Sequence, residues 1–101
     1  DMDNSIIDAF RKMPDDFMPT IITSDDGKIV EAHLPINGKD FALAMQVPHK
    51  EDGTVDQVKF DKRFARLRGS CWDTQELARL VAEGHELAPE LRNLLRESGV
   101  I

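Results

Sequence analysis

The sequence is short of aromatic residues and of cysteine. Its 101 residues include five Phe, one Trp and no Tyr. A core must therefore be built mostly from Leu, Ile, Val, Met and Phe. The single cysteine, Cys71, excludes a framework of internal disulfides. This composition is typical of a reducing compartment, and we expect a cytoplasmic location.

Long apolar runs are also missing. No stretch approaches the roughly 20 apolar residues that a membrane-spanning helix needs. The first residues lack the basic and apolar regions of a signal peptide. We therefore expect no membrane partner. With 101 residues, of which 41% are hydrophobic, the chain is predicted to form one domain, residues 1–101, around one core.

No signature of a cofactor or metal site is present. The sequence has no glycine-rich nucleotide-binding loop and no GxSxG motif. His33, His49 and His85 lack the short, paired spacing of zinc ligands. Alignment of Gly27 or Gly53 with the invariant glycine of an EF-hand leaves the required oxygen ligands missing. Neither a cofactor nor a metal is predicted.

Cys71 is the side chain best suited to nucleophilic catalysis, because it lies just before a predicted helix. Its neighbours Ser70 and Trp72 supply no base, and no family signature surrounds it. We favour a packing role beside Trp72. The 19 acidic residues give no reason to select one catalytic pair. The sequence leans against an enzyme, and no catalytic residue is assigned.

The N-terminal part predicts a short helix. Ile6, Ile7, Phe10 and Met13 have helical spacing, and Pro14 ends the pattern. After a loop, the period shifts towards two, which is typical of strands. We expect an antiparallel meander of about four strands at 20–23, 29–36, 40–47 and 55–60.

The third predicted strand alternates cleanly. Its inward positions are apolar: Phe41, Leu43, Met45 and Val47. Its outward positions are small or polar: Asp40, Ala42, Ala44 and Gln46. Ala42 and Ala44 therefore form a weakly apolar surface that another element or another subunit could cover. We regard these two residues as a candidate partner-facing surface.

Residues 59–68 fit two structures. Phe60, Phe64 and Leu67 have helical spacing, but Val58, Phe60 and Phe64 would equally fit a strand that bends. We favour a strand up to Phe60, followed by one or two helical turns that end at Gly69.

The last third predicts two short helices arranged as a hairpin. Asp73, followed three residues later by Glu76, resembles a capping box at the start of the first helix, and Gly84 ends that helix. Pro89 suits the first turn of the second helix, which Gly99 ends. A single kinked helix is the alternative. The predicted fold class is α+β, with the helical hairpin packed on one sheet face.

Charge is unevenly distributed along the chain. The net charge is −6, yet residues 59–68 carry +4. The basic residues of this stretch are Lys59, Lys62, Arg63, Arg66 and Arg68. With Phe60 and Phe64 between them, they are candidate contacts to nucleic acid or to a partner. The stronger interpretation places the Phe rings in the core and the basic stems over neighbouring residues.

These observations favour a small, acidic, intracellular protein-interaction module. Such a module would be a non-catalytic adaptor, an inhibitor, or an assembly or chaperone-like subunit. By charge complementarity an acidic chain suits a basic protein partner, and a homodimer is a second expectation because small domains gain stability by association. Nucleic-acid binding through 59–68 is the alternative. It is less favoured because the acidic field of the whole chain repels nucleic acid.

Overall fold

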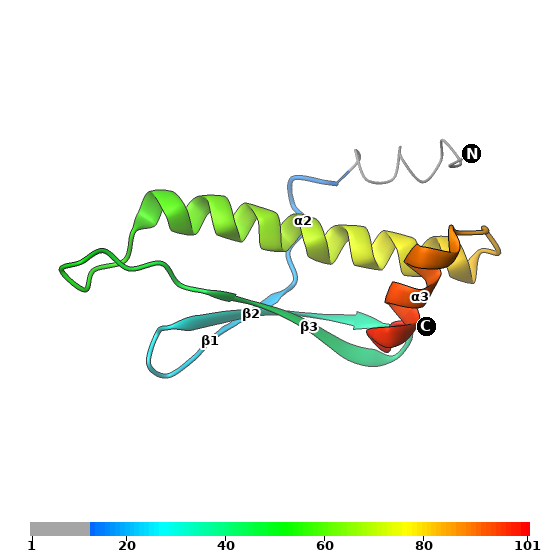
Figure 1. Ribbon diagram of the computed structural model, residues 1–101, viewed down its shortest axis with the longest axis horizontal. Coiled ribbons are helices and arrows are strands. Elements are labelled where there is room, and N and C mark those ends of the chain that lie inside the picture. Colours follow the sequence, from blue (N-terminus) through cyan, green and yellow to red (C-terminus); the bar gives the residue numbers. More distant parts are fainter. Residues whose placement is uncertain (1–12) are drawn as a thin grey trace.

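The computed structural model describes residues 13–101 and places three strands before two helices (Figure 1). The strands are β1 (Thr20–Thr23), β2 (Ile29–Ile36) and β3 (Lys39–Gln46). The helices are α2 (Gln57–Ala82) and α3 (Pro89–Glu97). The α+β class is therefore confirmed. The helix predicted before Pro14 falls on residues 1–12, which lie outside the described residues.

The sheet is an antiparallel meander with β2 at its centre. The turn between β2 and β3 is Asn37-Gly38, whose φ angles of 53° and 76° give both central residues the left-handed conformation. This is the two-residue hairpin that the Asn-Gly pair predicts. Ile36 consequently pairs with Lys39, and the register continues along both strands.

Burial alternates along β2, as the period of two predicts. Four residues of β2 face the core: Val30, Ala32, Leu34 and Ile36. α2 crosses this face of the sheet and supplies Leu67, Cys71 and Leu77 to the same core (Figure 1). With 26 residues, α2 is about 39 Å long, whereas an eight-residue strand spans about 27 Å. The helix therefore extends beyond the sheet that it covers.

The fourth strand predicted at 55–60 is wrong. Val55 forms only an isolated bridge to His49, and α2 begins at Gln57. The side chain of Asp56 accepts a hydrogen bond from the backbone N–H of Lys59 at 3.2 Å, which makes Asp56 the N-cap of the helix. This cap decides the local structure, because it satisfies a donor that the first helical turn otherwise leaves unpaired.

The break predicted at Gly69 and the helix start at Asp73 are also wrong. Both residues lie inside α2, which is continuous from Gln57 to Ala82. The resemblance to a capping box was misleading, because tertiary packing holds the helix together through this region. A longer stripe of apolar residues at helical spacing was the better indication of a continuous helix. It consists of Phe60, Phe64, Leu67 and Cys71.

The helix ends predicted at Gly84 and Gly99 are confirmed. After α2, the N–H of Gly84 donates to the carbonyl of Val81 and the N–H of His85 donates to that of Leu80, each at 3.0 Å. After α3, Gly99 and Val100 repeat this pattern on Arg96 and Leu95. These are the paired bonds of a Schellman motif.

α3 packs near the end of the sheet rather than alongside α2 as the second arm of a hairpin (Figure 1). Pro89 stands at its first position, as predicted. Leu95 and Val100 are buried, and the side-chain amide of Asn37 donates to the carbonyl of Val100. This bond links the turn between β2 and β3 to the end of the chain.

The continuity of α2 predicts opposite effects for two alanine substitutions. Gly69 is helical, and a Cβ built there meets no atom within 4 Å. Gly69→Ala should therefore raise the free energy of unfolding by about 0.5–1 kcal/mol. Gly84 has a φ of +91°, so Gly84→Ala should lower it by about 1 kcal/mol. Urea unfolding of both variants measures this, and a destabilising Gly69→Ala would contradict a continuous helix.

Candidate functional site

The five basic residues of the 59–68 stretch, which the sequence predicts as contacts, lie on two sides of α2. Four of them fall within about 100° of the helix circumference at 3.6 residues per turn. These four are Lys59, Lys62, Arg63 and Arg66, and we call them the basic face. Arg68 lies on the opposite side of the same helix. The structure therefore brings four of the five together and separates the fifth.

A groove of about 430 Å³ lies between the basic face and β3. Leu43 and Met45 of β3 contribute apolar side chains to it, as does Leu67 of α2. Arg63 and Arg66 line it from the α2 side. The groove thus combines an apolar floor with a cationic wall.

The backbone of β3 borders this groove with N–H and C=O groups that point away from β2. The N–H of Val47 donates to the carbonyl of Lys28 at 2.8 Å, so Val47 points towards β2. The carbonyl of Gln46 points the other way, where Arg63 Nη1 donates to it at 3.3 Å. Because successive residues of a strand alternate in direction, the N–H and C=O groups of Ala42 and Ala44 also point outward. No strand of the described part of the chain pairs with that edge.

The basic face has no acidic partner among residues 13–101. The side chains of Lys59, Lys62 and Arg66 form no ion pair or hydrogen bond with any described residue. Asp61, the one acid in the 59–68 stretch, instead accepts a hydrogen bond from Gln57 Nε2 at 2.8 Å. Within residues 13–101, no acidic side chain therefore neutralises the positive charge of the basic face.

Arg68, in contrast to the basic face, binds the protein backbone. Its Nε and Nη2 donate to the carbonyl of Phe17 at 3.0 and 2.6 Å, and Nη2 also donates to the carbonyl of Asp15 at 3.0 Å. The ring of Phe17 meets Trp72 edge-to-face, with centroids 5.1 Å apart. Arg68 thus fastens the segment that leads into β1 against α2.

This difference predicts that two neighbouring arginines contribute unequally to stability. Arg68→Ala should lower the free energy of unfolding by about 1.5–3 kcal/mol, because it leaves the part-buried carbonyl of Phe17 without its charged donor. Arg66→Ala, on an exposed side chain, should change it by less than about 0.5 kcal/mol. Chemical denaturation of the two variants measures both. Equal losses would contradict the separate roles.

Phe60 and Phe64 do not form a surface on which nucleic-acid bases could stack. Their rings stack on each other, with centroids 5.8 Å apart and planes 8° from parallel. Both are half-buried and packed against the core. The sequence interpretation that places these rings in the core is the one that the packing supports.

The sheet face opposite α2 carries Ala42 and Ala44, both exposed. Ile22 and Ile29 lie on the same face, with 48% and 42% of their surface exposed. No helix or strand of the described residues covers this face (Figure 1). It is the second surface that the described fold leaves open.

Acidic groups surround a histidine on that face. His33 Nδ1 lies 3.0 Å from Asp40 Oδ2, and His33 Nε2 lies 3.5 Å from Glu31 Oε2. His49 lies in the loop after β3 and His85 follows α2, so the three histidines are not brought together. Within residues 13–101, no group of three or more His, Cys, Asp or Glu side chains is placed to hold a metal ion.

Cys71 is fully buried in the core, at 0% exposure. Burial raises the pKa of its thiol above the ordinary value, because a thiolate loses its hydration there. The thiolate is the reactive form of cysteine, so this side chain is not suited to act as a nucleophile. Its role is packing, within the same core as Leu67 and Ala78.

This burial predicts low reactivity of the single thiol. In native protein, Cys71 should react with Ellman's reagent at least about 100-fold more slowly than in urea-unfolded protein, because opening must precede attack. The time course of thionitrobenzoate release measures both rates. Rapid, complete labelling of protein whose circular dichroism is unchanged would contradict the packing role.

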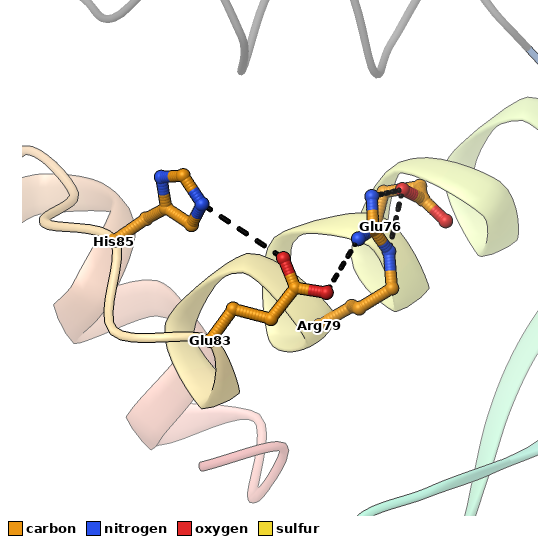
Figure 2. Close-up of polar contacts among 4 residues, drawn as sticks. All are labelled: Glu76, Arg79, Glu83 and His85. Atoms are coloured by element: carbon orange, nitrogen blue, oxygen red, sulfur yellow. Dashed lines mark hydrogen bonds and ion pairs between the residues drawn. The ribbon is translucent and has the colours of Figure 1, made fainter.

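A polar network at the end of α2 was not anticipated from the sequence (Figure 2). Arg79 donates from Nε and Nη2 to Glu76 Oε2, at 3.0 and 2.5 Å, and from Nη1 to Glu83 Oε1 at 2.8 Å. Glu83 Oε2 also lies 3.8 Å from His85 Nε2. These carboxylates raise the already high pKa of Arg79. The i, i+3 and i, i+4 spacing of Glu76, Arg79 and Glu83 was the feature of the sequence that could have predicted this network. Such spacing indicates that the network has a structural role in the helix.

Comparisons with protein-family models, with curated proteins and with solved structures found no match to this chain. Function must therefore be argued from the site itself. In the part of the chain that the structure describes, neither helix combines the length and the apolar character needed to cross a membrane.

Proposed function

We propose that this chain is a small, non-catalytic protein-interaction module of the cytoplasm, acting as an adaptor, an inhibitor or an assembly subunit. One observation carries the proposal: among the described elements, the sheet is covered on one side only. No described strand or helix covers its edge at β3 or the face that bears Ala42 and Ala44. Exposed strand edges and sheet faces are surfaces on which proteins commonly bind other proteins.

The uncovered face suits a basic protein partner. Glu31 and Asp40 lie on either side of His33 there, next to the exposed side chains of Ile22 and Ile29. Small side chains at Ala42 and Ala44 allow a partner to approach the strand closely. Charge complementarity at this face then favours a partner surface that carries Lys or Arg. A second copy of the chain is the alternative protein partner, and the measurement below distinguishes it from a different protein.

Nucleic-acid binding is the second candidate, and the basic face is the observation that favours it. Four cationic side chains that have no acidic partner among residues 13–101 could contact phosphates. Two features weigh against it: the net charge is −6, and Phe60 and Phe64 stack on each other rather than outward. Single-strand binding proteins depend on exposed aromatic rings for part of their affinity.

Position-resolved photo-crosslinking tests the proposal. p-Benzoylphenylalanine is placed at position 44 on the uncovered face, at position 66 beside the groove, and at position 51 in the exposed loop after β3 as a control. The protein is irradiated in lysate of its source cells, with and without nuclease. We expect position 44, position 66 or both to give a discrete protein adduct that survives nuclease and is absent at position 51.

Crosslinks that disappear with nuclease would instead favour the nucleic-acid candidate. An adduct between two copies of this chain would identify the partner as the chain itself. Crosslinking that is no greater at positions 44 and 66 than at position 51 would overturn the proposed interaction surfaces.

A further inference from the structure

We propose that the groove between β3 and α2 binds an extended acidic segment of another protein, which joins the sheet as an additional strand beside β3. This inference rests on the proposed function and names the chemistry of the partner. It uses the opposite side of the sheet from the face that suits a basic surface.

Between Phe41 and Met45, the edge of β3 lacks the features that normally keep strand edges from pairing. β3 has eight residues, contains no proline and carries no charge between Asp40 and Gln46. The other edge, β1, has only four residues. Natural proteins protect exposed edges with short strands, proline or charged residues. A long, uncharged edge with outward N–H and C=O groups at Ala42 and Ala44 is therefore a suitable template for strand addition.

The position of α2 gives the added strand a preferred sequence pattern. A strand beside β3 would lie about 4.8 Å from it, with side chains alternating between the two sheet faces. One set would enter the groove above Leu43 and Met45 and meet Arg63 and Arg66. The other set would lie on the uncovered face. The groove would therefore contact every second residue of the incoming segment.

Charge decides the type of residue that the groove accepts. Arg63 and Arg66 are the charged residues that line the groove, and the side chain of Arg66 has no ion pair or hydrogen bond among the described residues. Arginine presents a planar set of donors that matches a carboxylate. Glutamate or aspartate at alternate positions would satisfy these two arginines, whereas lysine there would add to a positive charge that no acidic side chain of residues 13–101 neutralises.

The same charge argues against a second copy of the chain at this edge. Two β3 strands paired about a two-fold axis would place their α2 helices on the same side of the joined sheet. The basic faces, which flank the β3 edge, would then oppose each other, and like charges would repel. Nucleic acid, for its part, offers no alternating amide groups to pair with Ala42 and Ala44.

Binding of a labelled alternating peptide, acetyl-(Glu-Val)₄-amide, tests the proposal by fluorescence anisotropy at low salt. We expect saturable binding that weakens as salt is added, because screening acts on the exposed charges. A Lys-Val peptide should bind at least about tenfold more weakly. A Glu-Val peptide N-methylated at alternate residues, in both registers, should also bind at least about tenfold more weakly, because it cannot pair with the edge.

A matched pair of protein variants locates the site. Arg66→Glu should weaken binding of the Glu-Val peptide at least about fivefold, because it places a carboxylate in the groove wall. Lys50→Glu makes the same change of charge in an exposed loop and should alter binding less than about twofold. Circular dichroism confirms that both variants fold, and the N-methylated peptide tests the edge with the protein unchanged.

Several results would overturn the inference: no binding of the Glu-Val peptide, equal binding of the Lys-Val or N-methylated peptides, or equal effects of the two variants. Binding of oligodeoxythymidine that is lost in Arg66→Glu, without peptide binding, would also overturn it and assign the basic face to nucleic acid. If the peptide fails while position 44 still crosslinks to a protein, the proposed function stands and only this inference falls.

Discussion

The packing of one long helix on one face of a three-stranded sheet is the constraint on which the rest of the structure depends. Alternate residues of β2, such as Ala32 and Leu34, can be buried only if an apolar surface lies above them. α2 supplies that surface from a stripe that includes Leu67 and Cys71. Among the described elements, a single helix covers the middle of the sheet, and none covers the β3 edge or the far face.

This arrangement also places the charges. Because α2 is continuous, residues that flank its buried stripe fall on two sides of the helix. Arg68 turns towards the segment before β1 and holds it by three hydrogen bonds to backbone carbonyls. Arg63 and Arg66 turn towards β3 and line the groove. The basic side of the groove and the acidic groups around His33 therefore lie on opposite faces of one small sheet, which is consistent with a role in joining proteins.

Local signals predicted the parts of the fold that local chemistry determines. Asn37-Gly38 specified its hairpin, the alternation in β2 and β3 specified their buried faces, and Gly84 and Gly99 specified helix ends. The start of α2 was missed because Val58 and Phe60 have the spacing of a strand, while Asp56 caps a helix. The groove was not predictable, since it requires β3 and α2 side by side. The basic residues were found, but their division into two sides depends on a helix that the sequence interpretation had broken at Gly69.

Amide hydrogen exchange of the free chain, measured residue by residue by NMR, tests the one-sided sheet most directly. If β3 is an open edge, the amides of Leu43 and Met45, which point towards β2, should exchange slowly. Those of Ala42 and Ala44 should exchange much faster, and the amides of β2 from Ile29 to Leu34 should all be slow. Uniform protection along β3 in the monomeric chain would show that another segment already occupies the edge, and would contradict the account.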